Sequence, residues 1–232
     1  KIDMSDYDYI EKLKETGAQK SAQYIKDCIS KLNAPLDKQK VQPFLMDNIA
    51  IVEELFADMD IIQSKTVQSE DNPSLQFFLV YCNVTVDHTV INEHIVKPLM
   101  KHSSPEIKDM DKLLSSVIQV SKSETTDNFG KIVEKVMSGN TVVFAEGMSE
   151  AAILKTEKYT LRAIEEPDNE KVLSGPKEGF NEDLMQNLSQ IIRRVHTNEL
   201  KARIMILGRR TKTKVCVCYF DSLADKNVLS QL

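Results

Sequence analysis

Carboxylate side chains crowd one stretch of this sequence, and paired carboxylates are what acid–base catalysis requires. The stretch is RAIEEPDNE at residues 162–170. In glycoside hydrolysis one carboxyl group donates a proton while a second acts as base or nucleophile, so a hydrolase that uses Glu165 and Glu170 is one hypothesis. Neighbouring side chains of an extended chain point to opposite sides, so Glu165 and Glu166 diverge. The cluster alone therefore does not define an active site.

A glycine-containing loop, GPKEGFNED at residues 175–183, follows the carboxylates. Such a loop ahead of a helix can bind phosphate through backbone N–H groups. Here Glu178, Glu182 and Asp183 place negative charge where the anion would lie, and the Gly-Lys-Ser/Thr ending of a phosphate-binding loop is missing. The simpler interpretation is architectural. Asn181 caps a helix, and the acidic residues complement its N-terminus.

Histidine and cysteine side chains show no metal-binding spacing. The histidines are His88, His94, His102 and His196, and no two of them form an HExxH pair. Two of the four cysteines, Cys216 and Cys218, lie two residues apart in an apolar run, so on a strand they share one face. We expect both thiols to be buried, reduced and inert in a strand at the centre of its sheet, and we expect no metal and no cofactor.

Basic residues gather near the C-terminus, although the chain as a whole carries a formal charge of −5. The densest part is the segment 208–214, and aromatic residues are not interleaved with its charges. This disfavours nucleic-acid binding. Two hypotheses stay open: contact with an acidic partner or anionic lipid, and a solvated hairpin tip without a role. The residues for this possible contact are Arg209, Arg210, Lys212 and Lys214.

The bulk composition is that of a folded protein. Of the 232 residues, 41% are hydrophobic and 28% are charged. No apolar run approaches the roughly 18 residues that span a bilayer, so the chain by itself is expected to be soluble. Because it starts at a lysine and stops inside an apolar periodic segment, we expect it to be a fragment of a longer protein.

Hydrophobic periodicity predicts the elements that position these residues. In the first two thirds we expect helices over 41–59, 87–99, 110–117 and 129–137, strands over 61–67 and 74–84, and a hairpin over 140–156. The continuously apolar strand 74–84 belongs at a sheet centre. Asp87 caps the second of these helices, Pro98 kinks or closes it, and Gly139 ends the fourth.

The last third repeats a small α/β pattern. A helix opens near Asn181, two strands at 201–207 and 214–220 are joined by GRRTKT, and a last helix begins near Ser222. We therefore predict an α/β (mixed α+β) fold with two small subdomains, each a mixed or antiparallel sheet with packed helices. The predicted division is a helical arm and linker at 1–40, a first subdomain at 41–160 and a second at 161–232.

A long gapped pattern runs through the last third of the chain. Its residues are Arg162, Glu166, Pro167, Glu170, Gly175, Pro176, Glu178, Gly179, Phe180, Glu182, Asn187, Arg193, Arg194, Leu200, Gly208 and Tyr219. With this pattern, the stretch from Arg162 to Val228 resembles the N-terminal domain of the GerA family, the A subunits of bacterial spore germinant receptors. Asn83-Val84-Thr85 departs from the family's Asp-Gly-Leu turn, and Lys177 and Asn181 also depart from its pattern.

The resemblance implies a function. Such A subunits join a soluble N-terminal domain of two α/β subdomains to a transmembrane domain, and they assemble with B and C subunits in the spore inner membrane. It implies that this domain lies on the cytoplasmic (spore core) side and that the receptor responds to nutrients such as amino acids or sugars.

Three functional hypotheses follow. The first is a non-catalytic receptor module in germinant sensing or receptor assembly. The second is a purely structural assembly domain without a ligand, and the third is the hydrolase. We expect the motif residues Glu166 to Glu182 to be mainly architectural, with Gly179 adopting a positive φ or packing closely before the helix.

Overall fold

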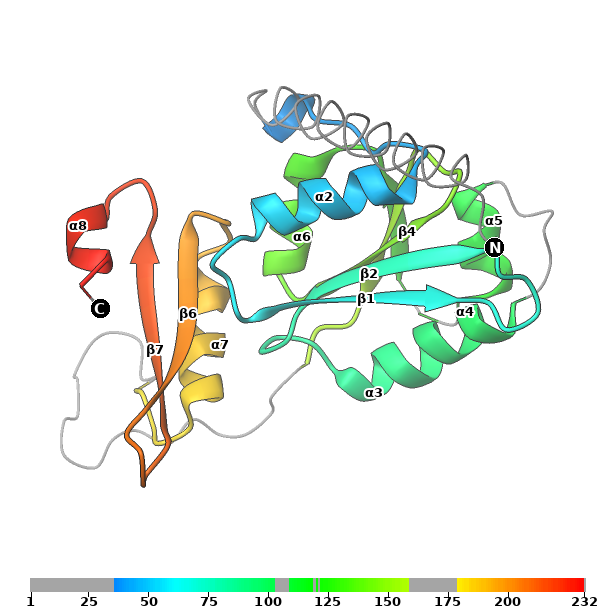
Figure 1. Ribbon diagram of the computed structural model, residues 1–232. Coiled ribbons are helices and arrows are strands. Elements are labelled where there is room, and N and C mark those ends of the chain that lie inside the picture. Colours follow the sequence, from blue (N-terminus) through cyan, green and yellow to red (C-terminus); the bar gives the residue numbers. More distant parts are fainter. Residues whose placement is uncertain (1–35, 103–108, 119, 121, 159–178, 232) are drawn as a thin grey trace, which may run out of the picture.

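A five-stranded antiparallel sheet forms the larger part of the molecule (Figure 1). The computed structural model describes residues 36–102, 109–118, 120, 122–158 and 179–231. The strand order is β1-β2-β4-β5-β3. The strands are β1 (Ile62–Gln68), β2 (Gln76–Cys82), β3 (Ser123–Thr126), β4 (Asn140–Ala145) and β5 (Ala151–Lys155). The predicted α/β class with antiparallel sheets is confirmed, whereas β3 was not predicted because it is short and polar.

Strand β2 lies inside the sheet, as its sequence predicts. Each of its residues after Gln76 is buried, because alternate side chains enter separate apolar layers on the two faces. Phe78 and Val80 pack into one layer, whereas Phe77 and Leu79 pack into the other. The continuous apolar run is therefore explained by burial on both faces.

Helices cover both faces of this sheet (Figure 1). One face carries α2 (Leu45–Leu55) and α6 (Phe129–Met137). The other face carries a helical run of α3 (His88–Val90), a π-helical segment (Ile91–Val96) and α4 (Lys97–Lys101), followed by α5 (Met110–Ser116). All four helices predicted for this part are present.

Of the two outcomes expected at Pro98, a kink or an end of the helix, the end is not observed there. Asp87 caps it, as predicted, by accepting hydrogen bonds from the backbone N–H groups of Thr89 and Val90. The backbone takes the wider π-helical turn just before Pro98 and then continues to Lys101. A wide turn accommodates the proline ring, which would clash with a carbonyl in a regular α-helix.

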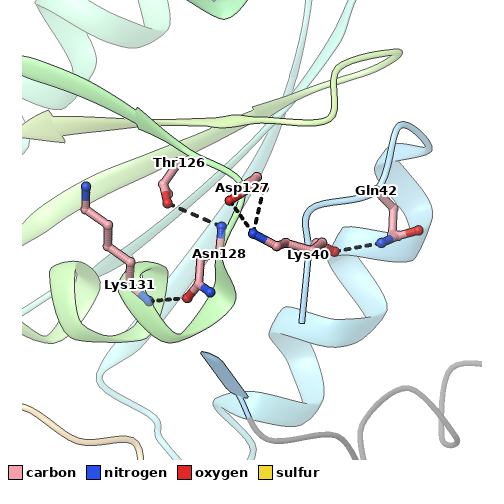
Figure 2. A network of polar contacts seen from close by, with 6 residues as sticks. All are labelled: Lys40, Gln42, Thr126, Asp127, Asn128 and Lys131. Atoms are coloured by element: carbon pink, nitrogen blue, oxygen red, sulfur yellow. Dashed lines mark hydrogen bonds and ion pairs between the residues drawn. The ribbon is translucent and has the colours of Figure 1, made fainter. Parts of the chain in front are cut away.

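The start of α6 is fixed by polar contacts that also hold the chain before α2 (Figure 2). Asn128 accepts a hydrogen bond from the backbone N–H of Lys131 at 3.0 Å. The ammonium of Lys40 lies 2.7 Å from the carboxylate of Asp127. The backbone of Lys40 pairs with that of Asn128 in an antiparallel bridge. Gln42 donates to the carbonyl of Lys40. The five-stranded sheet and the helices on its two faces form what we call the first unit. The segment that follows the short 3-10 helix Leu36–Lys38 is therefore packed against this unit.

A second, smaller unit contains one helix packed on a two-stranded hairpin (Figure 1). Its elements are α7 (Leu184–Arg194), β6 (Leu200–Leu207), β7 (Thr213–Phe220) and α8 (Lys226–Leu229). Two helix starts were misplaced. Asp183 rather than Asn181 caps α7, and α8 begins behind Asp225, beyond the expected Ser222. An aspartate carboxylate accepts hydrogen bonds from two N–H groups here, and sequence spacing cannot rank neighbouring cap candidates.

The predicted central position of β7 is wrong. In the part of the chain that the structure describes, β7 pairs only with β6. Consequently Cys216 is half-buried and Cys218 is exposed, with their sulfur atoms 3.8 Å apart on one face of the strand. An apolar strand can lie in a small sheet that is covered on one face only.

The two units share one hydrophobic core. Leu188 and Ile192 of α7 and Ala202 of β6 belong to the same buried cluster as Val52 and Phe56 of α2. The smaller unit therefore extends the packing of α2 and does not have a separate core. The predicted subdomain boundary near residue 160 falls in 159–178, outside the described residues, and the division into subdomains stays a prediction.

Candidate functional site

The motif residues that suggested a family fall into two groups. Nine are described: Gly179, Phe180, Glu182, Asn187, Arg193, Arg194, Leu200, Gly208 and Tyr219. The remainder of the predicted site lies outside the described residues: Arg162, Glu165, Glu166, Pro167, Glu170, Gly175, Pro176 and Glu178. The mainly architectural role expected of residues 166–182 therefore stays a prediction, as does the positive φ or close packing expected at Gly179.

Asn187 holds the loop in front of α7. Its side-chain oxygen accepts the backbone N–H of Asn181 at 2.9 Å, and its side-chain nitrogen donates to the carbonyl of Asn181 at 2.7 Å. Asn181 in turn accepts the backbone N–H of Asp183 at 2.9 Å. The carboxylate of Asp183 then accepts the N–H groups of Met185 and Gln186. These N–H groups are used internally, so the described part of the loop is a capping structure and not a phosphate cradle.

The C-terminal end of α7 is joined to the first unit. The guanidinium of Arg193 donates a hydrogen bond to the carbonyl of Lys158, close behind β5, at 3.3 Å. Arg193 and Arg194 lie in the last turn, where cations complement the partial negative charge of the helix terminus. Arg193 thus connects the two units directly.

Backbone pairing makes the main connection between the units, which we call the joint. It comprises residues 58–60, between α2 and β1, and Ala202 and Ile204 of β6. Met59 pairs with Ala202 in a parallel bridge. The backbone N–H of Asp60 donates to the carbonyl of Ala202 at 2.9 Å, and the backbone N–H of Ala202 donates to the carbonyl of Asp58 at 3.2 Å. The carboxylate of Asp60 accepts the N–H of Ile204 at 2.6 Å.

Charged side chains surround the joint. Burial lowers the pKa of the Lys201 ammonium, and the nearby carboxylates of Asp221 and Asp58 offset part of this effect. Asp58 has a positive φ of 59°, and its carboxylate lies 3.6 Å from the guanidinium of Arg203. Burial and the charge of Asp58 raise the pKa of Tyr219.

Sequence patterns did not reveal the joint, because its two halves are far apart along the chain. The hydrogen bond from Asn198 to the carbonyl of Leu55 at the same place spans 143 positions. The available signal was an acidic pair, Asp58 and Asp60, immediately after an apolar helix. Such a pair is common at solvated helix ends.

The basic hairpin tip is fully exposed. We use this name for residues 208–214, the turn between β6 and β7 with the first two residues of β7. Gly208 has a φ of +83°, and a Cβ at this position would lie 2.6 Å from the Thr211 hydroxyl. The four cations, Arg209, Arg210, Lys212 and Lys214, are exposed and form no ion pair or side-chain hydrogen bond with any described residue.

The tip is not next to the last helix. The tip precedes β7 and α8 follows it, so α8 and the tip lie at opposite ends of β7 (Figure 1). Eight residues of strand span roughly 26 Å. Any contact that the tip makes is therefore separate from the surroundings of α8.

The described residues contain no group of three metal-ligating side chains. None of the described helices is both long and apolar enough to cross a bilayer. The acid–base hypothesis rested on Glu165 and Glu170, which lie outside the described residues. Within residues 36–102, 109–118, 120, 122–158 and 179–231, the geometry supports contact and connection between units.

Comparisons with known proteins agree with the sequence motif. The chain is 32% identical over 154 residues to the uncharacterized membrane protein YfkQ of Bacillus subtilis (strain 168), which covers 66% of this chain and 30% of that protein. It is 25% identical over 193 residues to spore germination protein KA of the same organism, covering 83% of this chain and 36% of that protein. The chain thus spans about a third of these relatives' length.

A solved structure has the same fold. The N-terminal domain of the A subunit of the Bacillus megaterium spore germinant receptor GerK3 superposes with a TM-score of 0.62 at 20% identity, covering 83% of this chain and 71% of that chain. Residues 50–232 match the family described as Bacillus/Clostridium GerA spore germination protein. The resemblance inferred from the motif is therefore confirmed, and the chain belongs to the GerA family of spore germination proteins.

Proposed function

We propose that this chain is the N-terminal, non-catalytic domain of a spore germinant receptor A subunit, and that it connects receptor subunits during assembly and germinant response. The observation that carries the proposal is the joint. Backbone pairing and a shared core fix the small unit to the large one, so a force on the hairpin is transmitted to the five-stranded sheet. Interiors packed in this way transmit displacement and do not absorb it.

The partners that we propose are the B and C subunits of the receptor and the transmembrane domain of the same polypeptide. The receptor would lie in the spore inner membrane with this domain on the core side. The proposal leaves two ways for the assembled receptor to sense an amino acid or sugar germinant: through this domain directly, or elsewhere with this domain as scaffold. Nucleic acid is not among the proposed partners.

The test weakens the joint without removing core side chains. Asp60→Ala deletes the carboxylate that accepts the N–H of Ile204. The N–H would then lack its 2.6 Å partner, and the small unit should loosen at one edge of β6. Introduced into the full-length subunit in spores, the variant is expected to reduce recovery of B and C subunits with the A subunit and to slow nutrient-triggered germination.

The matched control removes a charged contact far from the joint. Lys97→Gln disrupts the exposed pair with Glu93 on the helical run that covers the opposite face of the sheet. Exposed pairs of this kind contribute little, so assembly and germination should be unchanged. Normal assembly and normal germination with Asp60→Ala, despite a looser joint shown by faster hydrogen exchange in β6, would refute the contact function.

A titration separates the two ways of sensing. The chain Lys1–Leu232 is titrated calorimetrically with mixtures of amino acids and sugars. Saturable binding supports direct sensing, whereas heat changes equal to those of dilution support an assembly domain without its own ligand.

A further inference from the structure

The basic hairpin tip combines charge with exposed aliphatic surface. Ile206 and Leu207, the last residues of β6, are 63% and 52% exposed. They point to opposite faces of the hairpin, because successive residues of a strand alternate. We call Ile206 and Leu207 the aliphatic collar. The cations of the tip come directly after the collar along the chain, so the collar lies next to the cationic end of the hairpin.

The pairing of the two strands brings the charges and the collar together. Ile206 is directly opposite Lys214, and Leu207 is directly opposite Thr213. The aliphatic stem of a lysine can cover apolar surface while its ammonium reaches outward. Two residues with positive φ, Gly208 at +83° and Lys212 at 47°, lie in the turn. The segment 206–214 contains no acidic residue that would neutralise these cations.

The shape of the tip disfavours a protein partner that contacts the tip alone. A stable protein interface buries about 800 Å² on each partner, from roughly 20–30 residues. The nine residues 206–214 form a narrow convex end of a hairpin and offer far fewer contacts. A membrane surface needs no matching shape. Its anionic headgroups attract Lys and Arg, and its acyl boundary accepts aliphatic side chains.

We propose that the tip and its aliphatic collar dock on an anionic phospholipid bilayer. The inference rests on the proposed function, since it gives the membrane receptor domain a second contact with lipid. The chain as a whole carries −5, so an anionic surface repels the remainder of the domain and attracts the tip. This polarity orients the domain, with the hairpin pointing to the lipid and the five-stranded sheet held away.

Cosedimentation with vesicles tests the proposal. The chain Lys1–Leu232 is mixed with vesicles of equal parts phosphatidylglycerol and phosphatidylcholine, and with vesicles of phosphatidylcholine alone. We expect binding to the anionic vesicles only, and weaker binding as salt is raised, because salt screens exposed charges. Equal binding to both vesicle types, or no binding to either, would overturn the proposal.

Two variants divide the contributions of charge and collar. Changing Arg209, Arg210, Lys212 and Lys214 to glutamine should weaken vesicle binding by at least about tenfold, since each cation contributes to the attraction. Changing Ile206 and Leu207 to serine should weaken it several-fold while leaving the salt dependence in place. All six side chains are exposed, so their replacement removes no core packing. Thermal unfolding should therefore show that both variants are folded.

A matched control keeps the change in net charge the same. Lys65, Lys97, Lys101 and Lys112 are exposed on the first unit, and their replacement by glutamine should leave binding within about twofold. An equal loss in this control would show unspecific attraction and contradict the proposal.

Spores carrying the tip variant separate lipid from protein contact. Suppose that the wild-type domain binds no vesicles and that the tip variant fails to assemble with B and C subunits. These two results together would assign the tip to a protein partner and refute lipid docking. The same result would leave the proposed function intact, because that function is tested at Asp60 and not at the tip.

Discussion

Truncating Leu188 on α7 tests whether the two units share one cooperative core. The side chain is 2% exposed and belongs to the cluster that contains Val52 and Phe56 of α2. Leu→Ala at such a site costs about 2–5 kcal/mol, from lost apolar transfer and from the cavity that remains. Alanine is a better helix former than leucine, so helix propensity does not add to the loss.

The expected effect of Leu188→Ala on thermal stability follows from the size of the chain. For domains of 150–250 residues, each kcal/mol lowers Tm by about 2–4 °C, so a loss of about 3 kcal/mol lowers it by about 6–12 °C. Leu184→Ala is the matched control. Leu184 lies in the first turn of the same helix and is only partly buried, so it should cost about 1 kcal/mol or less.

Hydrogen exchange followed by mass spectrometry distinguishes a shared core from separate ones. If the core is continuous, Leu188→Ala should lower the protection of slow amides in β2 and in β6 by the same free energy, because both open in one global event. A loss confined to β6 and β7, with β2 unchanged and urea unfolding in two steps, would show that the units fold independently. That result would refute the reasoning behind the joint.

Two further predictions use positions where the structure offers internal controls. Gly139→Ala should destabilise the chain by more than Gly147→Ala in urea unfolding. Both glycines have positive φ, which costs about 1–2 kcal/mol for any L residue. A Cβ at Gly139 also meets the Thr85 carbonyl at 3.2 Å, whereas one at Gly147 meets nothing within 4 Å. Equal losses of stability in the two variants would contradict the steric argument. Alkylation of the native chain should label exposed Cys218 first. Cys216 should react slowly at neutral pH and faster as pH rises, because burial and the neighbouring Cys218 raise its pKa to about 12 and only the thiolate reacts. Rapid labelling of Cys216 at pH 7 would contradict the raised pKa.

Local sequence rules identified most elements of the fold. Asp87 was recognised as a helix cap, and Gly139 as a helix end, from residue type and position alone. The apolar run of β2 was assigned correctly to the sheet interior. These signals are local, since a cap, a left-handed turn or a doubly buried strand leaves its mark within a few residues.

The cysteines show where local rules fail. The run around Cys216 and Cys218 is as apolar as β2, yet its strand pairs with only one other described strand. Periodicity reports which residues avoid water, and it does not report how many strands are available to cover them. The exposure of Cys218 is therefore a property of the assembly of elements, and the strand sequence does not contain it.

By itself, the sequence determined the family, the α/β class and the clustering of cations at the hairpin tip. Only the tertiary structure decided that Asp60 hydrogen-bonds the backbone of β6 and that Leu188 completes a core begun by α2. The physical reason is distance along the chain. Contacts between segments separated by more than a hundred residues depend on how whole helices and sheets pack, and one sequence carries no local signal for that packing.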